Sequence, residues 1–134
     1  MMNIKKIHHI AKVVDNIGEE LKKYSDLGFQ TQDQIFIDEP QGVRVGKVQS
    51  PGGITIELLE PLNENSPIYK FSKEKKGFHH VCIEVENIEN YLEFVKEKNI
   101  GFQLTKITTS VFDGRRACFF STNDREIIEI IEEK

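Results

Sequence analysis

The stretch Gly77-Phe78-His79-His80-Val81-Cys82-Ile83-Glu84-Val85-Glu86-Asn87-Ile88 decides the fold, because a version of it also occurs near the N-terminus. The earlier version is Ile7-His8-His9-Ile10-Ala11-Lys12-Val13-Val14-Asp15-Asn16-Ile17. A second match, also at a spacing of about 72 residues, joins Ile54-Thr55-Ile56-Glu57-Leu58-Leu59-Glu60 to Glu126-Ile127-Ile128-Glu129-Ile130-Ile131-Glu132. The chain is therefore one module repeated, and each copy has one strand with a histidine and one with a glutamate.

Hydrophobic periodicity predicts a strand, a helix and three more strands in each module. The strands of the first module are expected at residues 4–14, 29–38, 43–50 and 53–60. Its helix should begin after Asn16, present the apolar stripe Ile17, Leu21, Tyr24 and Leu27, and end at Gly28. In the second module, Asn87 should cap a helix over 88–98, and strands are expected at 78–86, 100–109, 115–121 and 125–133.

The predicted fold class is α+β, with two βαβββ modules that form a curled, eight-stranded mixed sheet with a concave face. A chain of 134 residues fits a single domain over 1–134. Within it, the first module is expected at about 4–62, a polar connector at about 63–76 and the second module at about 77–134.

Composition narrows the function classes. The net charge of −4 gives no general attraction to nucleic acid or to anionic membranes, so neither is expected as a partner. No apolar run reaches the ~20 residues of a membrane span, and the N-terminus leads into a strand, so a cytoplasmic location is expected. Cys82 and Cys118 are too few and too isolated for a disulfide framework, and both are interpreted as small buried residues.

Strand alternation places polar residues of the two modules on one common face. The residues expected on this face are His9, Ala11, Val13, Thr55, Glu57, Leu59, His80, Cys82, Glu84, Ile127, Glu129 and Ile131. A pseudo-two-fold axis between the modules would bring two histidines and two glutamates together. Two imidazoles and two carboxylates suit one divalent transition metal such as cobalt, nickel, zinc, manganese or iron.

The repeat resembles the vicinal oxygen chelate superfamily, which includes glyoxalase I, extradiol dioxygenases and bleomycin-resistance proteins. The resemblance covers the chain from Ile7 to Glu132. Within the superfamily, the chain is most similar to methylmalonyl-CoA epimerases. This similarity rests on Gln41-Gly42-Val43-Arg44-Val45, Ile56-Glu57-Leu58-Leu59-Glu60-Pro61-Leu62, Ser66-Pro67-Ile68, Gly77-Phe78-His79-His80-Val81 and Glu84-Val85-Glu86-Asn87-Ile88.

The resemblance implies that His9, Glu57, His80 and Glu129 are the metal ligands. Alternation alone does not choose between the two histidines of each doublet, and the family pattern selects the second. Enzymes of this kind remove a proton from the carbon beside a carbonyl and stabilise the resulting negative charge.

The resemblance to glyoxalases implies that Glu129 partially leaves the metal and acts as the catalytic base, and Glu84 is a second candidate. Some epimerases carry a carboxylate base on the third strand of the first module, where this chain has Val45. Two basic residues, Lys47 and Arg115, are expected to bind substrate, and Lys47 is suited to a carboxylate.

The function expected from these residues is that of a metal-dependent epimerase acting beside the thioester carbonyl of an acyl-CoA or another thioester. A glyoxalase I type lyase acting on a glutathione hemithioacetal is the first alternative. A non-catalytic small-molecule-binding or resistance protein of the same fold is the second alternative. The family resemblance also implies a homodimer.

Overall fold

The computed structural model describes residues 3–32, 34–110 and 113–134, and they form two compact units. The central unit is His9–His79, and the terminal unit consists of the N-terminal residues through His8 together with His80–Lys134. The boundaries fall inside the two histidine doublets, and the second of them lies close to residue 77, where the second module was predicted to begin. That the whole chain is one domain stays a prediction.

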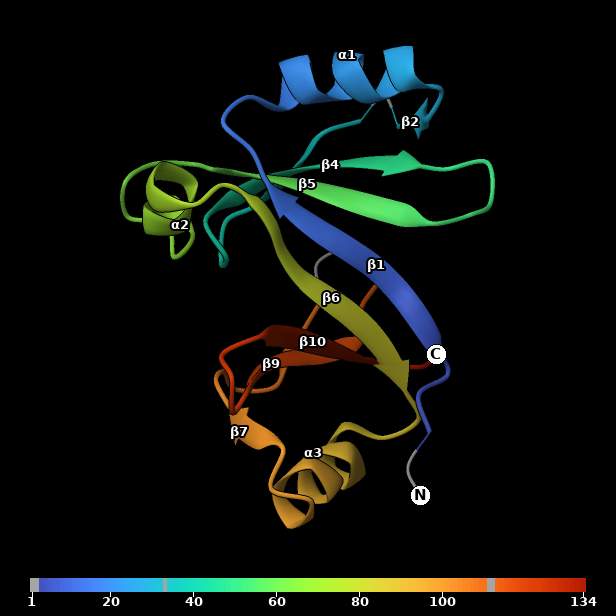
Figure 1. Ribbon diagram of the computed structural model, residues 1–134, viewed down its shortest axis with the longest axis vertical. Coiled ribbons are helices and arrows are strands. Elements are labelled where there is room, and N and C mark those ends of the chain that lie inside the picture. Colours follow the sequence, from blue (N-terminus) through green and yellow to red (C-terminus); the bar gives the residue numbers. More distant parts are fainter. Residues whose placement is uncertain (1–2, 33, 111–112) are drawn as a thin grey trace. The chain divides into compact units, whose positions relative to one another are not determined.

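The central unit contains most of β1 (Lys6–Val13), followed by α1 (Ile17–Leu27), β2 (Gln30–Thr31), β3 (Phe36–Asp38), β4 (Val43–Gln49), β5 (Thr55–Pro61) and α2 (Tyr69–Glu74). β1 pairs in parallel with β5, β5 pairs antiparallel with β4, and β4 pairs antiparallel with both β2 and β3. In this unit α1 lies along β4 and β5 (Figure 1).

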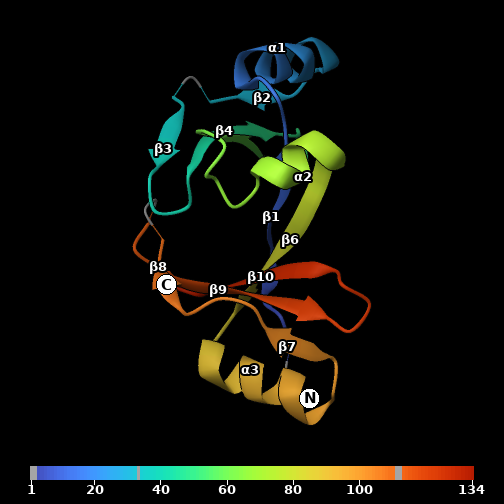
Figure 2. The same ribbon diagram turned by 90° about the vertical axis from the view of Figure 1, so that its left-hand side faces the viewer.

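The terminal unit repeats this order with most of β6 (Gly77–Val85), then α3 (Ile88–Glu97), β7 (Gly101–Gln103), β8 (Thr108–Thr109), β9 (Arg116–Thr122) and β10 (Ile127–Glu132). β6 pairs in parallel with β10, β10 pairs antiparallel with β9, and β9 pairs antiparallel with β7 and β8. The helix α3 lies against β7 (Figure 2). The predicted βαβββ modules are therefore confirmed.

One refinement concerns the second strand of each module. The strand predicted at 29–38 is divided into β2 and β3, and the strand predicted at 100–109 is divided into β7 and β8. Ten strands consequently appear among the described residues, where eight were predicted. Both members of each divided pair still bond to the same neighbour, β4 or β9, so the order of the strands is unchanged.

The helix ends are those that the sequence predicts. The Asn16 side chain accepts a hydrogen bond from Glu19 N–H (2.9 Å), and Gly28 ends α1 with a φ of 104°. The Asn87 side chain accepts the equivalent bond from Asn90 N–H (2.8 Å). The predicted stripe is wrong at Leu27, which is 66% exposed, because the last turn of α1 extends beyond the apolar surface that it covers.

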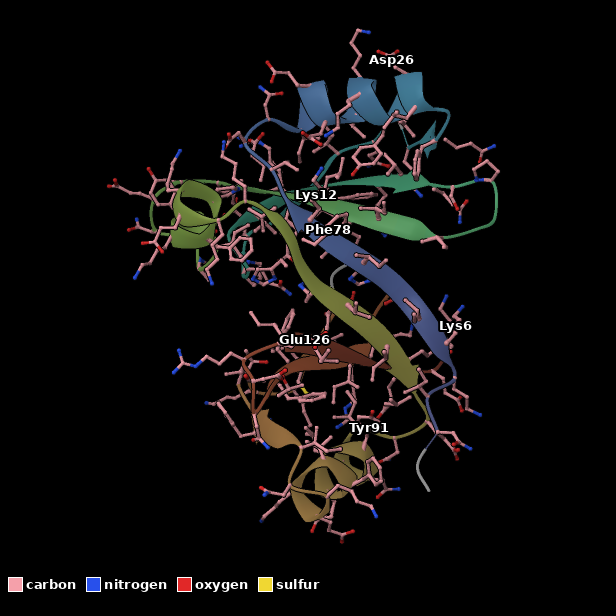
Figure 3. The ribbon with its side chains drawn as sticks, viewed as in Figure 1. Lys6, Lys12, Asp26, Phe78, Tyr91 and Glu126 are labelled. Atoms are coloured by element: carbon pink, nitrogen blue, oxygen red, sulfur yellow. The ribbon has the colours of Figure 1, made fainter. Side chains whose placement is uncertain are left out.

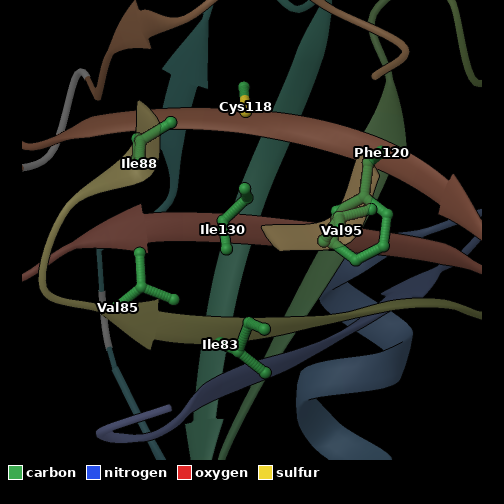
Figure 4. Packing of buried hydrophobic residues seen from close by; sticks show 7 residues of the cluster. All are labelled: Ile83, Val85, Ile88, Val95, Cys118, Phe120 and Ile130. Atoms are coloured by element: carbon green, nitrogen blue, oxygen red, sulfur yellow. The ribbon is translucent and has the colours of Figure 1, made fainter. Parts of the chain in front are cut away.

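Each unit has its own hydrophobic core under its helix. The core of the central unit contains Val14, Ile17, Tyr24, Val48, Ile56 and Leu58. The core of the terminal unit contains Ile83, Val85, Ile88, Val95, Cys118, Phe120 and Ile130 (Figure 4), and Tyr91, labelled in Figure 3, packs against it. Cys82 and Cys118 are both buried, as predicted. Among the described residues, no helix has the length and apolar character needed to cross a membrane.

Candidate functional site

In the central unit, His9 and Glu57 form a buried pair. Ala11 on β1 is the register partner of Glu57 on β5, and His9 lies two residues before Ala11 on the same strand face. The His9 Nδ1 atom is 3.3 Å from Glu57 Oε2. His9 is 5% exposed and Glu57 is 8% exposed, so an imidazole nitrogen and a carboxylate oxygen lie side by side, away from bulk water.

In the terminal unit, His80 and Glu129 form the equivalent pair. Cys82 on β6 is the register partner of Glu129 on β10, and His80 lies two residues before Cys82. The His80 Nε2 atom is 3.2 Å from Glu129 Oε1. The same strand pairing therefore builds the same histidine–carboxylate pair twice. Imidazole nitrogen with carboxylate oxygen is a donor set that divalent transition metals accept, so the residues fit the predicted metal.

The first histidine of each doublet has a different surrounding from the second. His8 Nε2 lies 2.8 Å from Arg115 Nη2. The His79 ring packs edge to face against Phe71, with centroids 4.8 Å apart. In each doublet it is the second histidine that lies beside the glutamate of its own unit.

Arg115 lies at the centre of a charged cluster in the terminal unit. Its Nη1 donates to Glu84 Oε2 (2.8 Å) and its Nε donates to Asp113 Oδ2 (2.8 Å). The hydrogen bond from Arg115 lowers the pKa of Glu84 below its usual value, outweighing the effect of burial. The cluster, which also includes His8, holds Glu84 as an ionised carboxylate.

Lys47 lies beside the pair of the central unit. It is the register partner of Glu57, and its Nζ is 3.9 Å from Glu57 Oε2. Val45, two residues earlier on the same strand, is 2% exposed. Nearby on β3 the sequence conceals a buried carboxylate, Asp38, whose Oδ1 accepts a hydrogen bond from Gln41 N–H (3.2 Å). Asp38 lies opposite Val43 in the pairing of β3 with β4, and no signal in the sequence indicated that this carboxylate is buried.

An aromatic residue and a lysine lie together on the helix-covered side of the central unit. Lys12 Nζ is 5.8 Å from the centroid of the Phe78 ring (Figure 3). The same ammonium is 3.2 Å from the Tyr24 hydroxyl and 3.3 Å from a Glu20 carboxylate oxygen. These contacts show that Lys12 is a packed and paired side chain.

The chain belongs to the glyoxalase/bleomycin resistance protein/dioxygenase superfamily, whose family model matches residues 8–119. This confirms the resemblance on which the sequence interpretation rests. Several relatives of the chain are named as methylmalonyl-CoA epimerases. The chain is 38% identical over 101 residues to the mitochondrial methylmalonyl-CoA epimerase of Bos taurus, and the match covers 73% of this chain and 57% of that protein.

Two further comparisons also find similarity to methylmalonyl-CoA epimerases. The chain is 36% identical over 98 residues to the ethylmalonyl-CoA/methylmalonyl-CoA epimerase of Cereibacter sphaeroides, covering 70% of this chain and 71% of that protein. A solved variant of Streptomyces coelicolor methylmalonyl-CoA epimerase, in complex with 2-nitronate-propionyl-CoA, matches with a TM-score of 0.81 at 21% identity. That match covers 98% of this chain and 99% of the solved chain, and it shows a shared fold. The chain spans a little over half the length of the mitochondrial relatives.

Proposed function

We propose that this protein is a divalent-metal-dependent epimerase that moves a proton on the carbon beside the thioester carbonyl of an acyl-CoA. The observation that carries the proposal is the presence of the same buried histidine–glutamate pair in both units. The identity of 36–38% to proteins named as methylmalonyl-CoA epimerases supports a malonyl-type thioester as substrate.

In this proposal, His9, Glu57, His80 and Glu129 together hold one ion of cobalt, nickel, zinc or manganese. When bound, such an ion supplies Lewis-acid stabilisation of the negative charge that develops on the substrate oxygens. The residues themselves supply a desolvated environment, since all four side chains are largely shielded from water.

Glu129 is the group that we assign as the proton acceptor. It lies in hydrogen-bond reach of His80 and its side chain is 13% exposed, so it is both oriented and shielded. Glu84 is a weaker base, because the hydrogen bond from Arg115 stabilises its ionised form and lowers its pKa. Arg115 in turn donates to Glu84 and Asp113, which supports a role in holding this cluster together.

Metal content per chain, measured after gentle purification, tests the proposed ligands. Wild type should hold close to one transition metal per chain, and both His80→Ala and Glu129→Ala should hold much less. His79→Ala is the matched control, since it removes the neighbouring imidazole and should leave metal content unchanged. Absence of metal in the wild type, with no uptake of added nickel, cobalt or zinc, would overturn the proposal that the enzyme depends on a metal.

Proton exchange tests the reaction. The loaded protein in deuterated water should incorporate deuterium at the α-carbon of methylmalonyl-CoA, detected by mass spectrometry. The hemithioacetal of methylglyoxal and glutathione serves as the competing substrate, and its conversion in preference to the thioester would favour the glyoxalase alternative. We also propose that the protein is a homodimer, as the family resemblance implies, and size-exclusion chromatography with light scattering tests this.

A further inference from the structure

Lys47 and Phe119 occupy equivalent positions in the two modules. Lys47 on β4 is the register partner of Glu57, and Phe119 on β9 is the register partner of Glu129. Register partners in an antiparallel ladder present their side chains on the same face of the sheet. The two pairs therefore consist of the same residue types, a histidine and a glutamate, but they have different neighbours. A lysine lies beside one pair and a phenylalanine beside the other.

The contacts within each unit agree with this register. Lys47 Nζ is 3.9 Å from Glu57 Oε2, the same oxygen that lies 3.3 Å from His9 Nδ1. In the terminal unit the Phe119 ring packs perpendicular to the His80 ring, with centroids 4.9 Å apart. Each side chain thus reaches the pair of its own unit.

The fold does not require a cation at this position. Phe119 shows that the equivalent place in the same strand arrangement accepts a large apolar side chain. The Lys47 side chain is only 19% exposed, and a charge held away from water carries a desolvation cost that an apolar side chain avoids. A lysine kept there at that cost indicates a role in binding.

We propose that Lys47 recognises a carboxylate on the substrate and so selects malonyl-type thioesters over neutral acyl thioesters. An anionic group that approaches Glu57 is repelled by that carboxylate, and the Lys47 ammonium offsets the repulsion and donates charge-assisted hydrogen bonds. This assignment rests on the proposed acyl thioester function. It adds the residue that binds the free carboxylate of the substrate.

Equilibrium binding tests the assignment without relying on turnover. The probes are malonyl-CoA and its analogue in which a neutral carboxamide replaces the carboxylate, titrated calorimetrically into the metal-loaded protein. Wild type should bind malonyl-CoA about tenfold to a hundredfold more tightly than the carboxamide, as expected for a hydrogen bond to a charged group. Lys47→Met should abolish this ratio, and Lys47→Arg should restore most of it.

The matched control is Lys22→Met, which removes an exposed lysine that pairs with Asp26 on the same helix, and it should keep the wild-type ratio. Circular dichroism and metal content verify that Lys47→Met is folded and loaded. A Lys47→Met protein that keeps the wild-type ratio would overturn the assignment, as would a wild type that binds both probes equally. If the wild type fails to exchange the α-proton yet Lys47→Met loses the binding ratio, the epimerase proposal fails and the assignment of Lys47 stands.

Discussion

The Glu60 carboxylate accepts a hydrogen bond from the backbone N–H of Ile17 at 3.0 Å, although 43 residues separate them. The terminal unit repeats this bond, since Glu132 accepts from Ile88 N–H at 3.0 Å. In both units an arginine on the neighbouring strand pairs with the same glutamate, Arg44 with Glu60 at 2.9 Å and Arg116 with Glu132 at 3.4 Å. A carboxylate at the start of a helix is stabilised by the partial positive charge there.

Removal of this carboxylate should destabilise the helix that it caps. Glu60→Ala loses the bonds to Ile17 and Arg44, and we expect the free energy of unfolding to fall by about 1–3 kcal/mol. Urea denaturation measures the change. Glu64→Ala, at an exposed position, is the control and should stay within about 0.5 kcal/mol of the wild type. Equal stability of the two variants would show that the cap contributes nothing.

The histidine doublets make a sharp prediction about metal binding. His9→Ala should reduce metal content, whereas His8→Ala should retain it, because only His9 lies beside Glu57 while His8 lies beside Arg115. The two variants remove the same chemical group from adjacent positions. Elemental analysis of both proteins, purified in parallel, decides the matter, and loss of metal from His8→Ala alone would reverse the assignment.

The ion pair of Glu84 with Arg115 should make stability depend on acid. The pKa of Glu84 in the folded protein is lowered from 4.5 by the hydrogen bond from Arg115. This pair therefore stabilises the fold above pH 4.5, and its contribution disappears as the pH falls through the lower folded value. Glu84→Gln should lose about 1 kcal/mol at neutral pH. Thermal unfolding of both proteins, measured from neutral pH to below pH 4.5, should show that their difference in stability decreases as the pH falls. A stability difference that does not change with pH would contradict this prediction.

Gly101 on β7 should tolerate no side chain. A Cβ atom at this position would lie 2.0 Å from the backbone oxygen of Ser121 on the paired strand β9. We expect Gly101→Ala to cost about 1–3 kcal/mol through displacement of the edge strand. Gly52→Ala is the matched control, since its Cβ would meet only the Ser50 hydroxyl at 3.8 Å. Equal unfolding free energies for the two variants would refute the steric argument.

Much of this fold was readable from the sequence because local and repeated signals coincide. The caps Asn16 and Asn87 act over three residues, and the matching halves place each helix and strand twice. The same repeat set His9 beside Glu57 and His80 beside Glu129, since strand alternation and parallel pairing are both periodic. These features depend on spacing, which a sequence displays directly.

Other features depend on which distant segments meet, and the sequence does not display that. The bond from Ile17 to Glu60 joins residues far apart in the chain, although the paired repetition of Arg44 with Glu60 and Arg116 with Glu132 was a signal that could have revealed it. The hydrogen bonds of Arg115 likewise depend on tertiary structure, since its partners Glu84 and Asp113 lie on a strand and in a turn, and its role in binding substrate stays a prediction.

The central unit, His9–His79, is a single uninterrupted segment, whereas the terminal unit takes residues from both ends of the chain. Because the chain is synthesised from its N-terminus, every residue of the central unit is translated before most of the terminal unit. The first residues, through His8, pair with residues that are translated after the central unit, among them Glu84, Arg115 and Glu133. The order of synthesis thus allows the central pair, His9 and Glu57, to form while the pair of His80 and Glu129 is still being made.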